Sequence, residues 1–169
     1  MIRYIILSFL IFGLLISVSC NQKSRPDGMP ELYPFSIKIL QEGQPLVEAN
    51  VVLHPEDKAL SRWPCGAYTN AEGIAEFRTY GSHSGAPAGK FKVVVQKVVT
   101  EGGNRSDDPK DIMSNPNATE ASKSFNLVDA QYQTAESTPF SVEVKPGKNR
   151  EIPEFDVGAA VHEPVQGVM

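Results

Sequence analysis

The sequence predicts an all-β fold, a seven-stranded antiparallel sandwich of two sheets that follows an N-terminal signal segment. Short segments alternate apolar and polar residues with a period of two, which is the pattern of half-buried strands. The 13 glycines and 13 prolines gather mainly between these segments, where turns are needed. After the N-terminal segment, no stretch has the periodicity of a long amphipathic helix. These three observations together indicate sheet packed on sheet.

The first half of the domain supplies three strands and a hairpin turn. Large apolar side chains occupy every second position of residues 35–39, which predicts the first strand. The second is expected at residues 49–54 and the third at residues 66–69. Residues 70–73 read Asn-Ala-Glu-Gly, a turn in which Gly73 can take a positive φ angle.

The middle of the chain supplies the strongest strand pattern. We expect a strand at residues 74–79 and then a long loop at residues 80–89, where turn-forming residues dominate. Residues 89–99 predict a central strand, because both faces carry valine. Residues 101–125 are poor in apolar side chains and rich in Asn, Ser, Asp and Gly, so we interpret them as a loop insertion with one helical turn at most.

Two more strands complete the predicted sandwich. Residues 139–145 alternate again, and residues 146–149 read Pro-Gly-Lys-Asn, which predicts a turn. Residues 151–157 are expected to form the last strand. The tail at residues 158–169 is expected to be loose.

An apolar segment begins near the first residue and ends at Cys20. Arg3 is its only charged residue, residues 4–18 are almost entirely apolar, and small residues precede the cysteine. This pattern resembles the lipobox of bacterial lipoprotein signal peptides, with Ser17 at a position that is usually leucine. The resemblance implies an exported lipoprotein of the bacterial cell envelope, anchored to the membrane by acyl chains such as palmitate on Cys20.

Two other interpretations of this segment stay open. Ordinary cleavage of a secretory signal also suits the small residues before Cys20, and it would leave a free exported domain. An uncleaved transmembrane anchor is disfavoured by length, because residues 4–18 fall short of the roughly 20 residues that cross a bilayer.

The chain therefore divides into four parts. Residues 1–19 are the expected signal peptide and residues 20–34 a flexible tether, since they mix polar residues with prolines and have little apolar content. Residues 35–157 form one sandwich domain that includes the insertion at residues 101–125. Residues 158–169 are the tail.

Charge and cysteine content exclude some classes of function. The net charge is −4, and the 16 basic side chains are scattered without the stripe that binds phosphates, so nucleic acid is not an expected partner. If Cys20 carries lipid, Cys65 has no partner for a disulfide within the chain, and the hydrophobic core must stabilise the fold. We expect Cys65 to behave as a small apolar residue.

Four motifs then follow one another in the order of a known family. Residues 43–53 read GQPLVEANVVL, residues 69–77 read TNAEGIAEF, residues 85–95 read GAPAGKFKVVV and residues 144–149 read VKPGKN. Together they resemble the transthyretin-like and carboxypeptidase regulatory-like domains, over residues 34–157. The resemblance implies a Greek-key, immunoglobulin-like sandwich and, for small bacterial lipoproteins of this kind, a structural or interaction role without known activity.

The sequence differs from the family pattern at particular positions. Asn70 stands where the family favours Asp, Glu48 stands where Gly is common, and residues 101–125 are inserted. We do not expect these differences to change the fold.

No catalytic arrangement is visible in the sequence. His54, His83 and His162 are far apart, and the zinc-protease and C-x-x-C spacings are absent. Residues 81–85 read Gly-Ser-His-Ser-Gly, so histidine replaces the serine of a nucleophile elbow. The closing Tyr-Arg-Gly-Ser of the related hydroxyisourate hydrolases is also missing. We therefore expect no enzyme, cofactor or metal site, with a small hydrolase of the transthyretin-like family as the alternative.

The acidic residues of the insertion suggest a calcium site only weakly. Asp107, Asp108 and Asp111 could gather around Ca²⁺, but they lack the fixed ligand spacing of calcium loops, and a solvated acidic loop explains them better.

Three aromatic residues are candidate ligand contacts. Trp63, Tyr68 and Tyr80 could offer faces on which a polysaccharide stacks, although a single tryptophan in a sandwich more often covers the edge of the core. An envelope protein could instead add a strand to a sheet edge. The sequence does not indicate the oligomeric state.

Overall fold

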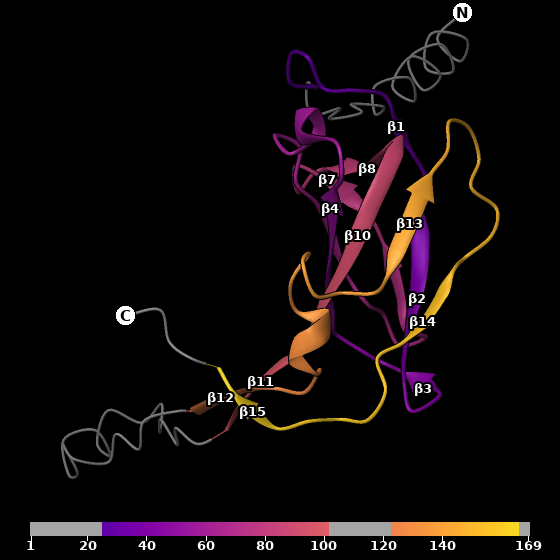
Figure 1. Ribbon diagram of the computed structural model, residues 1–169. Coiled ribbons are helices and arrows are strands. Elements are labelled where there is room, and N and C mark those ends of the chain that lie inside the picture. Colours follow the sequence, from indigo (N-terminus) through magenta and orange to yellow (C-terminus); the bar gives the residue numbers. More distant parts are fainter. Residues whose placement is uncertain (1–24, 102–122, 166–169) are drawn as a thin grey trace, which may run out of the picture.

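The structure is a computed structural model that describes residues 25–101 and 123–165, and its fold is all-β (Figure 1). The predicted fold class is confirmed at this level. Two larger sheets face each other, and smaller sheets extend them at the ends. In place of seven uninterrupted strands, these residues form segments β1 to β15, several of them only two residues long.

The largest sheet is antiparallel and has six strands in the order β13, β10, β4, β5, β7, β8. In chain order these are β4 (Asn50–Pro55), β5 (Cys65–Tyr68), β7 (Arg78–Thr79), β8 (His83–Ser84), β10 (Gly89–Gln96) and β13 (Ser141–Val144). Close to the predicted central position, β10 lies one strand in from the edge and is paired on both sides, with six residue pairs to β4 and four to β13.

The facing sheet is built around β2 (Ser36–Gln41). Its other members are β3 (Gln44–Pro45), β6 (Ile74–Glu76) and β14 (Glu154–Asp156). The pairing of β14 with β2 is parallel, so the expectation of a purely antiparallel sandwich is wrong at this strand. The chain can run parallel there because it returns from β13 through a long connection before it forms β14.

The remaining elements lie at the ends of the two sheets. Strand β1 (Leu32–Tyr33) pairs with β9 (Ala86–Pro87). A separate sheet contains β11 (Val98–Glu101), β12 (Lys123–Asn126) and β15 (Glu163–Pro164), and it projects from the body of the domain (Figure 1). Two 3₁₀ turns complete the described elements, η1 (Lys58–Leu60) and η2 (Ala130–Tyr132).

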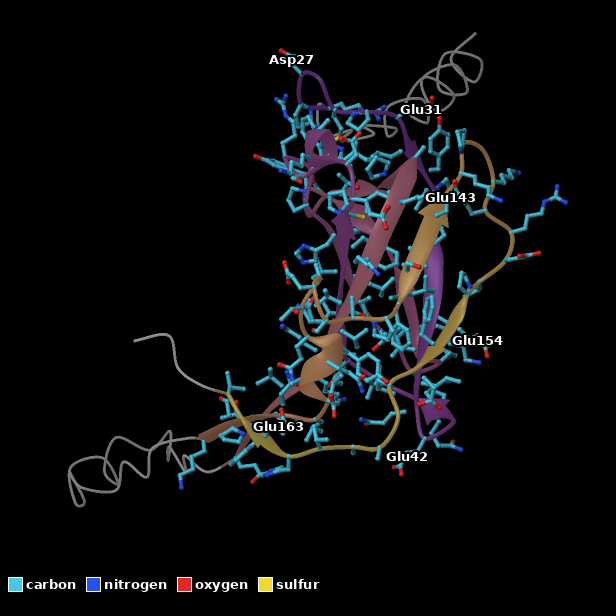
Figure 2. All side chains as sticks on the ribbon, viewed as in Figure 1. Asp27, Glu31, Glu42, Glu143, Glu154 and Glu163 are labelled. Atoms are coloured by element: carbon cyan, nitrogen blue, oxygen red, sulfur yellow. The ribbon has the colours of Figure 1, made fainter. Side chains whose placement is uncertain are left out.

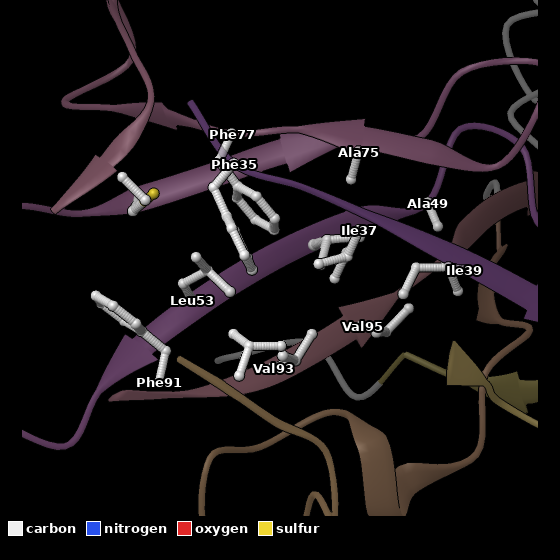
Figure 3. Packing of buried hydrophobic residues seen from close by; sticks show 14 of the residues in the cluster. Phe35, Ile37, Ile39, Ala49, Leu53, Ala75, Phe77, Phe91, Val93 and Val95 are labelled. Atoms are coloured by element: carbon white, nitrogen blue, oxygen red, sulfur yellow. The ribbon is translucent and has the colours of Figure 1, made fainter. Parts of the chain in front are cut away.

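Alternating apolar side chains fill the space between the two larger sheets (Figure 3). Strand β2 contributes Ile37 and Ile39, which are fully buried, and β10 contributes Val93 and Val95 from the opposite side. Burying one such side chain stabilises the folded state by about 1.5–3 kcal/mol. The facing apolar rows therefore supply the main driving force for bringing the sheets together. Other members of this core are Phe35, Leu46, Ala49, Val51, Leu53, Cys65, Ala75, Phe77, Ala86, Phe91, Val128, Val142, Val144 and Val157.

The expected single strand at residues 74–79 is divided at Phe77. Strand β6 pairs with β2 in one sheet, whereas β7 pairs with β5 in the other. The Phe77 amide donates to the Phe35 carbonyl at 3.1 Å, and the two rings stack with centroids 5.9 Å apart. Residues 74–79 thus cross from one sheet to the other and close that edge of the sandwich.

Aromatic side chains cover part of the opposite edge, which lies between β13 and β14. Phe140 stacks on Tyr132 at a centroid distance of 4.8 Å and lies 4.7 Å from Phe155. All three rings are partly buried against the core. They join η2 to both larger sheets, because Phe155 belongs to β14 and Phe140 directly precedes β13.

The expected strand at residues 89–99 also divides, at Lys97. Here β10 ends and β11 begins in the projecting sheet. The buried Asn126 side chain sits at this junction, where its Oδ1 accepts hydrogen bonds from the Lys97 amide at 3.2 Å and the Val128 amide at 3.1 Å. A side-chain acceptor replaces the sheet hydrogen bonds that the chain loses when it leaves β10.

Several segments expected to be irregular are ordered. The end of the expected tether forms β1, and Met29 is buried. Strands β8 and β9 lie within the expected loop at residues 80–89. Both ends of the expected insertion belong to the β11–β12 pair, and the expected loose tail contains β15, which pairs with β12. Long-range pairing supplies order that the composition does not indicate. Residues 1–24, 102–122 and 166–169 lie outside the described structure.

We expect Asn126→Ala to lower the free energy of unfolding by about 1–3 kcal/mol, because the buried Val128 amide and the partly buried Lys97 amide lose their acceptor. Chemical denaturation followed by circular dichroism would measure the loss. Asn149→Ala is the matched control, since the Asn149 Oδ1 also accepts an amide hydrogen bond, from Lys145, but on an exposed turn where water can replace it. Equal losses in the two variants would contradict the assigned role of Asn126.

Candidate functional site

Pairing between β5 and β7 brings two of the three candidate aromatic residues together. Trp63 lies two residues before Cys65, and Tyr80 directly follows Thr79, which is the register partner of Cys65. The Tyr80 amide donates to the Pro64 carbonyl at 2.8 Å. The two aromatic side chains therefore meet at the end of the six-stranded sheet where β5 begins and β7 ends.

The cluster of Arg62, Trp63 and Tyr80 has a defined geometry. The rings of Trp63 and Tyr80 meet edge to face, with centroids 6.1 Å apart and an angle of 67°. The Arg62 guanidinium carbon lies 5.0 Å from the Trp63 ring centroid, within cation–π range. Trp63 is only 7% exposed, whereas Tyr80 is 56% exposed. The surfaces that this cluster offers to a ligand are thus the Tyr80 ring and the Arg62 guanidinium.

Tyr68 lies apart from this cluster, at the opposite end of β5. It lies three positions along the strand from Cys65, which corresponds to about 10 Å. Its side chain is 73% exposed. Cys65 points into the core, so the alternation along the strand places Tyr68 on the outer face of the sheet. The structure therefore forms two candidate contact areas and not one.

Polar side chains accompany Tyr68 on the outer face. The register aligns Tyr68 with Asn50 on β4 and Asn50 with Gln96 on β10. Adjacent strands are about 4.8 Å apart, so the three residues form a row about 10 Å long. The side-chain amide of Gln96 donates through Nε2 to the backbone carbonyl of Gln133 at 3.3 Å, and this bond orients the Gln96 end of the row. We call Tyr68, Asn50 and Gln96 the Tyr68 row.

The three histidines occupy separate surroundings. His54 is exposed on β4, and His83 lies on β8. His162 stacks on Phe125 at 3.9 Å and lies 3.1 Å from a Glu101 carboxylate oxygen, on the projecting sheet. Among residues 25–101 and 123–165, no group of three His, Cys, Asp or Glu side chains could hold a metal ion. Asp107, Asp108 and Asp111 lie outside the described residues.

Cys65 is buried in the core, with 1% of its surface exposed. Burial raises the pKa of its thiol to about 11, although a hydrogen bond with Thr79 acts in the opposite direction. At neutral pH the sulfur is therefore a thiol, not the thiolate that nucleophilic chemistry needs. This surrounding fits the expected role of Cys65 as a small apolar residue.

Asp156 is a structurally important carboxylate that sequence reasoning missed. Its oxygens accept hydrogen bonds from the amides of Gly158 at 2.8 Å, Gly43 at 2.8 Å and Glu42 at 3.2 Å. These bonds, led by the one from Gly158, lower the pKa of the carboxyl group. The side chain thus fixes the turn between β2 and β3 to the end of β14. The turn and the acid are more than 110 positions apart, so no local motif indicates the contact.

Comparisons with protein-family models, with curated proteins and with solved structures find no match to this chain. Cys20, the expected lipid attachment site, lies outside the described residues. Within the described residues, no helix is long and apolar enough to cross a membrane.

We expect native Cys65 to react with a thiol reagent such as dithionitrobenzoate far more slowly than a free thiol does, because its surface is covered and its pKa is raised. A Cys20→Ser variant isolates this signal, and unfolding in guanidinium should restore full reactivity. Rapid labelling of the folded variant near pH 7 would contradict a structural role.

Proposed function

We propose that this protein is a non-catalytic, lipid-anchored interaction module of the bacterial cell envelope. The observation that carries the proposal is the position of β1. Leu32 pairs with Pro87, so the first strand of the domain begins only twelve residues after Cys20. A chain of that length reaches at most about 40 Å. Acyl chains on Cys20 would therefore keep the domain close to the membrane surface, where envelope components are its neighbours.

Three buried threonine side chains in the core have structural roles, because each forms a hydrogen bond with a backbone group. Thr69 accepts from the Ala49 amide, Thr79 donates to the Gly85 carbonyl and Thr138 donates to the Val93 carbonyl, each at 2.8 Å. These groups hold loops and strand ends in place. Together with the covered Cys65 thiol, they favour a binding module over a hydrolase of the transthyretin-like family.

We also propose that the domain is of the transthyretin-like or carboxypeptidase regulatory-like kind. Its motif residues have clear physical roles. Gly73 has φ 75°, and a side chain there would come within 2.6 Å of the Ile39 carbonyl oxygen. Asn70 Oδ1 accepts from the amides of Glu72 and Ile74, which Asp could do equally well. The Asn149 side chain bonds the Pro34 carbonyl and spans the closing turn. Turn motifs with such demands support the resemblance.

A polysaccharide ligand is the second candidate, and the Tyr68 row favours it. An exposed aromatic ring can stack on the apolar face of a sugar, while amide side chains can donate to and accept from its hydroxyl groups. Tyr68, Asn50 and Gln96 combine these groups on one sheet face. The cluster of Arg62, Trp63 and Tyr80 offers less stacking area to a sugar, because its tryptophan is covered.

Lipid attachment can be tested by intact mass and by labelling with radioactive palmitate in a bacterial host. We expect the native protein to begin at residue 20 and to carry acyl groups, and the Cys20→Ala variant to carry none. A cleaved chain without acyl groups would contradict the anchor and indicate a free exported domain. An uncleaved chain would indicate a signal anchor.

Polysaccharide binding can be tested by affinity electrophoresis through gels that contain purified cell-wall or capsular glycans. If the Tyr68 row is the site, Tyr68→Ala should abolish retardation by a glycan that retards the parent protein, because stacking supplies much of the contact. Tyr80→Ala is the matched control on the other candidate area. Equal retardation of Tyr68→Ala and the parent protein would exclude this row as the site.

A further inference from the structure

The N-terminal chain meets the domain at one particular end of the sandwich. Leu32 lies opposite Pro87, just before β10 begins. In the antiparallel register, β4 and β13 end beside the start of β10, and β5 begins where β7 ends. The connections at this end are residues 25–31, 56–64, 80–88 and 145–149. We call them together the tether-side end (upper part of Figure 1).

The two ends of the sandwich differ in charge. Five basic residues lie on the connections of the tether-side end, against four acidic ones: Arg25, Lys58, Arg62, Lys145 and Lys148, with Asp27, Glu31, Glu56 and Asp57. At the other end, the charged residues include Glu42, Glu48, Glu72, Asp129 and Asp156 together with Lys97, so acidic residues predominate there. Figure 2 shows Asp27 and Glu31 at one end and Glu42 at the other. A negative surface would therefore repel the far end more strongly than the tether-side end.

The cluster of Arg62, Trp63 and Tyr80 belongs to the tether-side end. Tryptophan and tyrosine concentrate at membrane–water interfaces, because their rings combine an apolar body with a polar tip. Arginine and lysine are attracted to anionic headgroups. Here the exposed Tyr80 ring and the Arg62 guanidinium stand beside a covered tryptophan, and Lys58 lies on the neighbouring turn η1.

We propose that the tether-side end rests on the anionic phospholipid headgroups of the membrane that holds Cys20, with Tyr80, Arg62 and Lys58 in contact with them. This inference rests on the lipid anchor proposed above. The anchor makes docking an intramolecular event, so weak contacts suffice to orient the domain. The result is an upright sandwich whose acidic end and projecting sheet point away from the membrane.

The chain contains one tryptophan, Trp63, which makes the contact directly measurable. The full lipidated protein would be reconstituted into vesicles of phosphatidylglycerol and phosphatidylcholine that carry a nitroxide quencher on a fraction of the headgroups. We expect loss of Trp63 fluorescence in these vesicles, and much less loss in vesicles of phosphatidylcholine alone. High salt should reverse the loss, because it screens charges at the surface.

A double variant of the proposed contact residues and a matched aromatic control separate headgroup docking from simple tethering. Lys58→Ser combined with Tyr80→Ser should weaken the quenching, whereas Tyr68→Ser on the outer sheet face should leave it unchanged. Near-ultraviolet circular dichroism would verify that both variants fold, and the salt response of the unsubstituted protein tests docking without any variant.

The outcomes distinguish this inference from the function on which it rests. If the acyl mass is present and the protein floats with the vesicles, but Trp63 is not quenched, docking is wrong and the anchor stands. Quenching that is equal in both lipid mixtures and insensitive to salt would also overturn headgroup recognition. If no acyl group is found on Cys20, the anchor and the docking both fail.

Discussion

The apolar layer between β2 and the β4–β10 pair is the constraint on which the rest of the fold depends. Cys65 is a free thiol within the core, so burial of aliphatic and aromatic side chains has to hold the two sheets together. That layer fixes the register of β10 against its two neighbours, because a shift by one residue would turn Val93 and Val95 to the outside. The positions of the loops that carry Trp63 and Tyr80 depend on this register.

Local pattern predicts the strands of this layer well and the path of the chain between them poorly. Residues 35–39, 49–54 and 89–96 alternate clearly, and they form β2, β4 and β10. The local pattern does not reveal the breaks at Phe77 and Lys97, because Phe77 and Val99 continue the apolar alternation across them. Which sheet a residue joins depends on partners far away in the sequence. The formation of strands β1 and β15 also depends on distant partners, β9 and β12.

The candidate site was predictable as a set of residue types but not as an arrangement. The aromatic residues can be identified in the sequence. Only the β5–β7 register shows that Trp63 meets Tyr80 while Tyr68 faces another surface. Tyr68 acquires its amide neighbours from β4 and β10 in the same way. Asp156 gives no local signal, since its hydrogen-bond donors come mainly from the distant turn of β2 and β3. The arrangement of the candidate contact residues depends on strand register more than on motif.

The crossing of residues 74–79 between the sheets also determines how the molecule can open. A sandwich whose sheets share no strand can separate along its apolar layer while both ladders stay intact. Here β6 remains bonded to β2 and β7 to β5, so separation has to break backbone hydrogen bonds in one sheet or the other. Partial opening is thereby penalised, and the amides around Phe77 should exchange with solvent only through global unfolding. Such cooperativity limits the local openings at which cleavage by a protease begins.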